Sequence, residues 1–395
     1  MKNYKFCWEW LDGCAVRSNV AWRSVRTSLI LFLAAFSIRG SVWLSGFWRY
    51  LGLIEYDSGF YIFSGRAMVS GLMSGDSYAL LINPVHPPLG KLMLGLFSLI
   101  FEFALGAFNS GILLMCVVSS LTSLLVFKIG CTLYGKRGGL TAWAIYALDP
   151  FSIHWTIAWL DAPSLLFITL AQYLLLDGRR RSRLLALALA SYYLALLTKF
   201  QAIFFLPAIL IFLRTRRERL IFVLAAFIML FLNPQFMLPG GFEKVISENL
   251  SLTSGSFQGL RSSYNLLLLI PIEFFYRVCV GYVGANVLPY LSPLILFYLL
   301  FWRGSGLGDE LAARWFLLTL IGVIIAPRLL IQEYYYVYTT VPISLLISSV
   351  IHRNKTIPGK YYLIKLSSIG SLLSITSFLL NPTCWKILLL FIAGM

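Results

Sequence analysis

Long apolar segments alternate with short polar turns along most of the chain. A helix that crosses a bilayer upright needs about 20 mostly apolar residues. Segments of this kind, some of them shorter, cover residues 28–47, 109–132, 139–154, 160–176, 184–198, 200–213, 219–238, 284–302, 311–327, 335–351, 361–380 and 384–395. The pattern predicts an all-α polytopic membrane protein with about eleven or twelve transmembrane helices.

The composition excludes most other classes of protein. Only 12% of the 395 residues are charged and 59% are hydrophobic, whereas soluble domains carry about 25% charged residues. A soluble enzyme or a disordered chain is therefore excluded. The six cysteines form no CxxC pair, so neither a disulfide framework nor a zinc site is indicated.

The net charge of +16 helps to orient the chain. Basic turns mark the cytoplasmic side of membrane proteins. They lie at Lys136–Arg137, Arg179–Arg183, Arg214–Arg219, Arg303 and Arg353–Lys360. All fall on one side if residues 89–105 do not fully cross, so we expect that segment to lie along or dip into the outer face. No basic stretch is long, soluble and interleaved with aromatic residues, so nucleic acid is not an expected partner.

In this orientation two polar segments, residues 48–88 and 239–283, lie on the outer face of the membrane. In the first, Asp57 precedes a predicted amphipathic helix at 60–74. A partly desolvated carboxylate at the membrane surface can act as a general base, although a solvated interfacial Asp is the simpler alternative. His86-Pro87-Pro88 fixes His86 at the start of the next helix. Lys91, one turn later, either faces an anion or reaches toward the lipid headgroups.

These residues resemble a known family pattern. The pattern consists of Arg39 late in the first span, Asp57 at the start of the outer loop, and the intact motif His86-Pro87-Pro88-Leu89-Gly90-Lys91. It is similar to that of the dolichyl-phosphate-mannose–protein mannosyltransferases. It is also similar to that of the bacterial lipid A aminoarabinose transferases. Both are membrane glycosyltransferases of the GT-C type. This chain departs at Ser58, where the family usually has a second acidic residue.

Weaker similarities follow in order. They lie at Tyr134–Arg137, Ala147–Pro150, Trp159–Pro163, Leu197–Phe200, Gln332–Tyr336 and Pro342. The first 200 residues match more closely than the C-terminal half. With the charge and hydropathy pattern, we expect four segments: a cytoplasmic N-terminal segment at 1–27, a GT-C catalytic membrane module at 28–238 that includes the loop 48–88, a second outer loop at 239–283, and C-terminal transmembrane helices at 284–395.

The resemblance also implies the chemistry. A sugar would move, with inversion, from a polyprenyl or dolichyl phosphate to an acceptor hydroxyl, with Asp57 as the base. The candidates for binding the lipid phosphate are Lys199, Arg328, Arg39, His86 and Lys91. The supporting residues are Asp161, Glu333 and Tyr335. No metal or other cofactor is expected, because a monophosphate donor has no diphosphate to chelate.

Physical reasoning gives a second explanation for two of the cations. Lys199 and Arg328 lie at the outer ends of apolar segments, where an unpaired cation is costly. They would either bind the phosphate or form ion pairs with Asp57, Asp161 or Glu333, and a resting ion pair can open for substrate.

Other functions stay open at this point. We expect an integral protein of the plasma membrane or endoplasmic reticulum, with its site on the extracytoplasmic or lumenal face and a protein, lipid or glycan acceptor. A flippase or transporter for a lipid-linked glycan would share the spans, although the sequence lacks matching halves with broken helices. A membrane assembly partner without catalysis would leave the HPPLGK motif unexplained.

Overall fold

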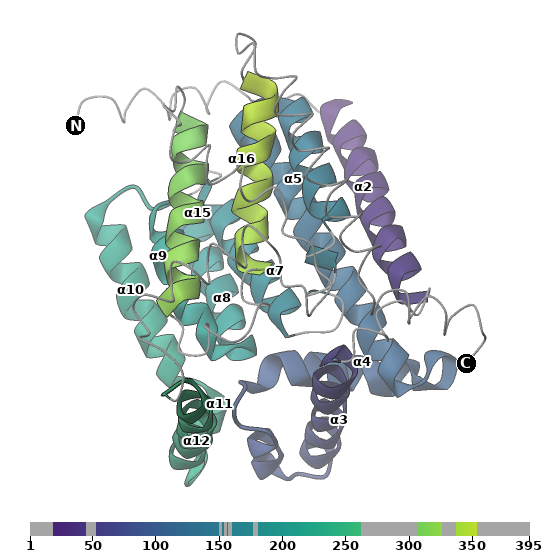
Figure 1. The fold of residues 1–395 in the computed structure, drawn as a ribbon, viewed down its shortest axis with the longest axis vertical. Coiled ribbons are helices and arrows are strands. Elements are labelled where there is room, and N and C mark those ends of the chain that lie inside the picture. Colours follow the sequence, from purple (N-terminus) through teal and green to yellow (C-terminus); the bar gives the residue numbers. More distant parts are fainter. Residues whose placement is uncertain are drawn as a thin grey trace.

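The computed structural model describes residues 19–44, 53–149, 152–153, 156, 160–176, 181–261, 307–325 and 337–353. Within these ranges every regular element is a helix (Figure 1). The helices are α2 (Asn19–Leu44), α3 (Leu53–Met73), η3 (Ser77–Leu81), α4 (Pro88–Leu105), α5 (Ala107–Leu148), α7 (Asp161–Leu176), α8 (Arg181–Thr198), η4 (Phe200–Phe205), α9 (Leu206–Leu210), α10 (Arg216–Phe231), α11 (Pro234–Met237), α12 (Gly241–Arg261), α15 (Leu307–Ile325) and α16 (Thr340–Arg353).

The described helices confirm an all-α polytopic membrane protein. Among them, three are long and apolar enough to cross a bilayer: Val25–Leu44, Pro88–Leu105 and Ala107–Leu148. Shorter apolar helices cover Asp161–Leu176, Ser182–Thr198, Phe200–Leu210 and Val337–Ser349. The predicted segments at 284–302, 361–380 and 384–395 lie outside the described residues. The total number of spans, and the prediction that 89–105 does not fully cross, therefore stay predictions.

Helix α5 is broken at the turn that the sequence predicts beside Lys136–Arg137. Gly135 has φ 76° and ψ 177°, a left-handed conformation that glycine adopts without a Cβ clash. Two hydrogen bonds fix this break to other helices: Tyr134 Oη donates to the Gly308 carbonyl (3.0 Å), and Ser348 Oγ donates to the Gly138 carbonyl (2.6 Å). The break thus joins α5 to the N-terminus of α15 and to α16.

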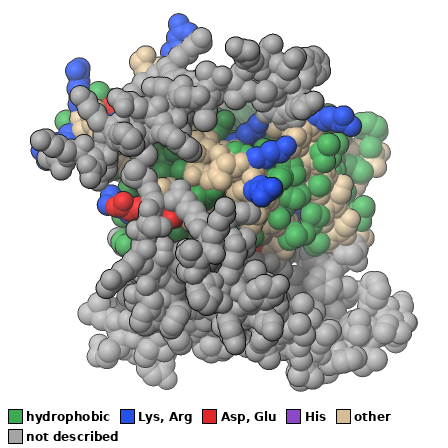
Figure 2. All heavy atoms as spheres, turned by 90° about the horizontal axis from the view of Figure 1, so that it is seen from above, with side chains coloured by type: hydrophobic (Ala, Val, Ile, Leu, Met, Phe, Trp, Pro, Cys, Tyr) green, Lys and Arg blue, Asp and Glu red, His purple; other side chains and the backbone are tan. Residues whose placement is uncertain are grey.

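The start of α10 is basic and exposed, whereas its end leads into α11. It begins with a capping box of Thr215 and Glu218 beside the exposed Arg216 and Arg217. Its 16 residues extend ~24 Å to Phe231, just before α11. Helices α3, α11 and α12 gather at the lower end of the molecule in Figure 1. Figure 2 looks onto the opposite, upper end and shows Lys and Arg side chains over the described part of that face.

The two polar segments contain more helix than the sequence indicates. A helix was expected at 60–74, but α3 begins at Leu53, so Asp57 lies within its first turns and not ahead of it. The segment 239–283, expected as a loop, contains α12. Because Phe242, Ile246 and Leu250 lie four residues apart and are exposed, α12 presents one apolar stripe.

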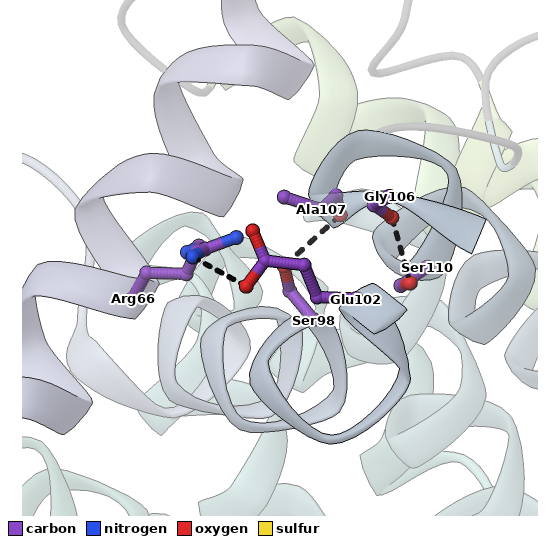
Figure 3. A network of polar contacts seen from close by, with 6 residues as sticks. All are labelled: Arg66, Ser98, Glu102, Gly106, Ala107 and Ser110. Carbon is purple, nitrogen blue, oxygen red and sulfur yellow. Dashed lines mark hydrogen bonds and ion pairs between the residues drawn. The ribbon is translucent and has the colours of Figure 1, made fainter. Parts of the chain in front are cut away.

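Helix α3 packs on α4 through two glycines. A Cβ added to Gly65 would overlap the backbone of Lys91 and Gly95, and a Cβ added to Gly95 would overlap the backbone of Gly65. The two backbones therefore touch. Beside this crossing, Arg66 of α3 forms an ion pair with Glu102 of α4 at 2.7 Å (Figure 3).

The turn from α4 to α5 lies next to that ion pair. Gly106 has φ 74° and donates its backbone N–H to the Glu102 carbonyl at 2.8 Å. Ser98 Oγ donates to the Ala107 carbonyl (3.0 Å) and Ser110 Oγ to the Gly106 carbonyl (2.8 Å), as Figure 3 shows. These bonds satisfy carbonyls at the turn, so α4 is held firmly between α3 and α5.

The glycine crossing predicts the effect of an added methyl group. We expect Gly65→Ala to lower the stability of the protein by about 1–3 kcal/mol or more, because the two helices must separate. Gly59→Ala on the same helix is the control, since among the described residues its Cβ would meet only Phe63, at 4.0 Å. Thermal unfolding in detergent measures both variants. Equal midpoints for the two would contradict the close crossing.

Candidate functional site

The loop from residue 82 to residue 87 presents His86 between η3 and α4. Asn83 in this loop has φ 52°, and Pro88 opens α4, where the missing N–H costs nothing. Lys91, one turn into α4, is fully buried. Its ammonium donates to the carbonyls of Ile82 (3.0 Å), Asn83 (2.5 Å) and His86 (2.8 Å). All three of its protons are used, so Lys91 fixes the shape of the loop.

The His86 ring lies against α3. A hydrogen bond of 3.2 Å joins its Nε2 to the hydroxyl of Tyr61, and the two rings meet edge to face with centroids 5.3 Å apart. The side chain is only 7% exposed. Tyr61 follows Asp57 by one helical turn, and residues four apart share a helix face. Asp57 thus precedes Tyr61 by one turn in the same helix.

Lys199 and Asp161 form a buried ion pair. Lys199 Nζ lies 2.5 Å from Asp161 Oδ2, and the two side chains are 1% and 0% exposed. Asp161 is the first residue of α7, where the helix dipole favours a carboxylate. Lys199 follows the last residue of α8 in an extended conformation. This is one of the pairings predicted for a cation at the outer end of a span.

The ion pair and the His86 loop belong to one site. Gly90 of the HPPLGK motif packs against Leu160 and Thr198, the residues next to Asp161 and Lys199. A Cβ on Gly90 would lie 2.9 Å from a side-chain atom of each. The start of α4 therefore packs directly on the start of α7 and the end of α8. This close contact accounts for the glycine in the motif.

Helix α11 completes the site, and no sequence pattern indicated its part in it. Gln235 is fully buried, and its Nε2 donates to the carbonyls of Leu80 (2.8 Å) and His86 (3.3 Å). The neighbouring Phe236 stacks on Phe200, with ring centroids 5.6 Å apart. A single glutamine between apolar residues carries no pattern, so its contacts emerge only from the fold.

Arg39 lies in a separate polar cluster between α2 and α5. Its side chain is fully buried, and its Nε donates to Ser119 Oγ at 2.5 Å. Its Nη1 donates to the carbonyls of Ala35 (3.4 Å) and Ala147 (3.5 Å). The guanidinium carbon stands 5.6 Å from the centre of the Tyr146 ring. These contacts join α2 to both parts of α5, whereas the sequence predicted a phosphate ligand here.

The remaining predicted residues are placed only in part. The backbone of Asp57 is helical, but its side chain lies outside the described residues. The adjacent Ser58, which replaces the usual second acidic residue, is fully buried. Arg328, Glu333 and Tyr335 also lie outside the described residues. Their predicted roles therefore stay predictions.

Comparison with known proteins identifies the segment that carries this site. Residues 85–237 match the family model for "Dolichyl-phosphate-mannose-protein mannosyltransferase". The match begins one residue before His86 and ends two residues after Gln235. It therefore covers the HPPLGK motif, the ion pair and α11. No curated protein sequence matches the chain.

Two solved structures share the fold. Both are of ArnT from Cupriavidus metallidurans, one in the apo state and one bound to undecaprenyl phosphate. The TM-scores are 0.54 and 0.53, at 15% and 13% sequence identity. The similarity covers 89% and 90% of this chain but 62% and 64% of ArnT, so the chain spans less than two thirds of ArnT. The resemblance inferred from the sequence is confirmed.

Proposed function

We propose that this chain, whose residues 85–237 match the mannosyltransferase family and whose fold is that of ArnT, is a membrane glycosyltransferase with a polyprenyl-phosphate sugar donor. The observation that carries this proposal is the extent of the family match. It coincides with the segment that places His86, Lys91, Asp161, Lys199 and Gln235 around one loop and one helix junction.

The proposed reaction is a single displacement at the anomeric carbon. Asp57 takes the proton of the acceptor hydroxyl, whose oxygen forms the new glycosidic bond. The bond from the anomeric carbon to the phosphate oxygen breaks, and the phosphate leaves with about one more negative charge. Among the described residues, His86 and Lys199 are proposed to stabilise that charge. Attack from the side opposite the phosphate inverts the anomeric centre.

Two features of the site bear on phosphate binding. Lys199 is held by Asp161 in a buried pair, so a donor phosphate would bind Lys199 by displacing the carboxylate. Asp161 would then be free to orient the acceptor. The contacts of Lys91 and Arg39 favour structural roles for both residues. Arg328 is a further proposed phosphate ligand, and Glu333 and Tyr335 are proposed supporting residues.

The charge distribution supports a site on the outer or lumenal face. Exposed Arg216 and Arg217 at the start of α10 fit the cytoplasmic side. The site includes α11, beyond the other end of that helix. The donor is proposed to carry a mannose-like hexose, and the acceptor is a protein, lipid or glycan hydroxyl. The proposed chemistry needs no metal ion or other cofactor.

A flippase for a lipid-linked glycan is the second candidate. One of the ArnT structures is bound to undecaprenyl phosphate, and a carrier site of that kind would also suit a flippase. The two functions differ in one outcome: a transferase leaves the sugar on an acceptor, whereas a flippase moves it across the membrane on its original carrier.

The test separates these functions directly. The purified chain is incubated in detergent with labelled polyprenyl-phosphate sugars, a membrane and protein extract, and EDTA. Polyprenyl-diphosphate sugars and nucleotide sugars serve as comparison donors. We expect label to move from the monophosphate donors to an acceptor that the product identifies. Label that stays on the carrier, together with carrier movement across vesicle membranes, would favour the flippase.

A further inference from the structure

We propose that Gln235 is a positioning residue for His86, and that α11 sets the spacing between His86 and Lys199. This inference rests on the proposed transferase activity and adds an element to it. Gln235 lies in α11, about 150 residues from the loop it contacts, and it is not among the residues that the sequence pattern suggests.

The carbonyl groups of the loop need hydrogen-bond donors from outside the loop. Its own backbone bond, from the His86 N–H to the Asn83 carbonyl, is long at 3.4 Å, and the two prolines that follow contribute no N–H donors. Lys91 supplies three donors from within the same motif. Gln235 supplies two further side-chain bonds, to Leu80 before the loop and to His86 at its end. The His86 carbonyl is thus held from two sides.

Gln235 is itself held rigidly. Asn233 caps α11, because its Oδ1 accepts from the Gln235 N–H at 3.0 Å. On the other side Gly241 packs directly on the Gln235 carbonyl, and a Cβ at Gly241 would overlap that atom. A buried amide on a capped, packed segment has few rotamers available. It can therefore fix the carbonyl that it binds, and with it the direction of the His86 ring.

Adjacent residues of α11 reach the two halves of the site. Gln235 binds the His86 loop, and Phe236 stacks on Phe200 with ring planes 5° apart. Phe200 directly follows Lys199, so α11 contacts the chain on both sides of the proposed phosphate site. Loss of the Gln235 bonds would leave Lys199 in place and let His86 shift relative to it. Shifts of about 1 Å at a reacting centre can cost about a hundredfold in rate.

Gln235→Met tests this proposal, because it removes the amide donors at similar volume. We expect kcat for sugar transfer to fall about ten- to a hundredfold, with the KM for the acceptor within about twofold. Gln172→Met is the matched control. Gln172 is also fully buried and donates its Nε2 to a backbone carbonyl, that of Ala208 at 3.3 Å, but it lies three turns along α7 from Asp161. We expect this variant to keep the wild-type kcat.

A second comparison separates positioning from general destabilisation. In the His86→Ala background, Gln235→Met should change kcat by less than about twofold, because the group that it positions is gone. Where His86→Ala leaves no measurable turnover, the Kd for undecaprenyl phosphate is compared instead. The four proteins compared are the wild type, Gln235→Met, His86→Ala and the double variant. An equal loss in both backgrounds, or a wild-type kcat for Gln235→Met, would overturn the proposal. A wild-type chain that transfers no sugar would instead overturn the proposed function.

Discussion

Asp57→Asn is expected to abolish sugar transfer, with a fall in turnover of about a thousandfold or more. A general base contributes about 10²–10⁴-fold, and an amide of the same size cannot take the proton of the acceptor hydroxyl. Because the substitution changes little volume, binding of the lipid donor should persist. Turnover is measured with a labelled polyprenyl-phosphate sugar, and donor binding with undecaprenyl phosphate.

Two variants serve as controls for this result. Asp76→Asn changes a carboxylate on the same polar segment, where Asp76 is exposed and caps η3 by accepting from the Tyr78 N–H at 2.9 Å. Ser58→Ala changes the buried residue next to Asp57. Both should retain most of the activity. Equal turnover in Asp57→Asn and wild type would remove Asp57 as the base, and a loss in Asp76→Asn would indicate a general need for negative charge there.

The fold class and the HPPLGK part of the site could be predicted from the sequence because both depend on local patterns. Apolar periodicity defines the helices, and HPPLGK combines two prolines, a glycine and a cation in six residues. The structure gives each a local reason: Pro88 opens α4, and Gly90 contacts Leu160 and Thr198. The start of α3 was harder to predict, because the apolar residues ahead of Asp57 also suit the end of the preceding span.

The roles of the cations depend on contacts that spacing does not reveal. Lys91 was predicted to meet an anion or the lipid headgroups. In the structure it meets three carbonyls around a loop in which Asn83 has φ 52°. Arg39 was predicted as a phosphate ligand, which stays a prediction, and the structure adds its contacts with Ser119 and Tyr146. Gln235 reaches the loop from about 150 residues away, and only the packing of α11 brings the two together.

Substitution of the Lys199–Asp161 pair gives the second large expected effect, on both the stability and the activity of the protein. Lys199→Met should destabilise the protein by about 3–5 kcal/mol, because it leaves the Asp161 carboxylate buried without its cation. The double variant Lys199→Met, Asp161→Leu removes both charges at similar volume and should recover most of that stability. Neither variant should transfer sugar, since the proposed phosphate ligand is absent from both.

The exposed pair of Arg66 and Glu102 is the control for this comparison. Its side chains are 23% and 45% exposed, and exposed pairs contribute only about 0–1 kcal/mol. Arg66→Met should therefore shift the thermal midpoint little and leave transfer intact. Recovered stability without activity in the double variant would show that the buried pair serves the reaction and not the fold. If that variant regained activity with stability, the ion pair would be structural and Lys199 would be lost as a phosphate ligand.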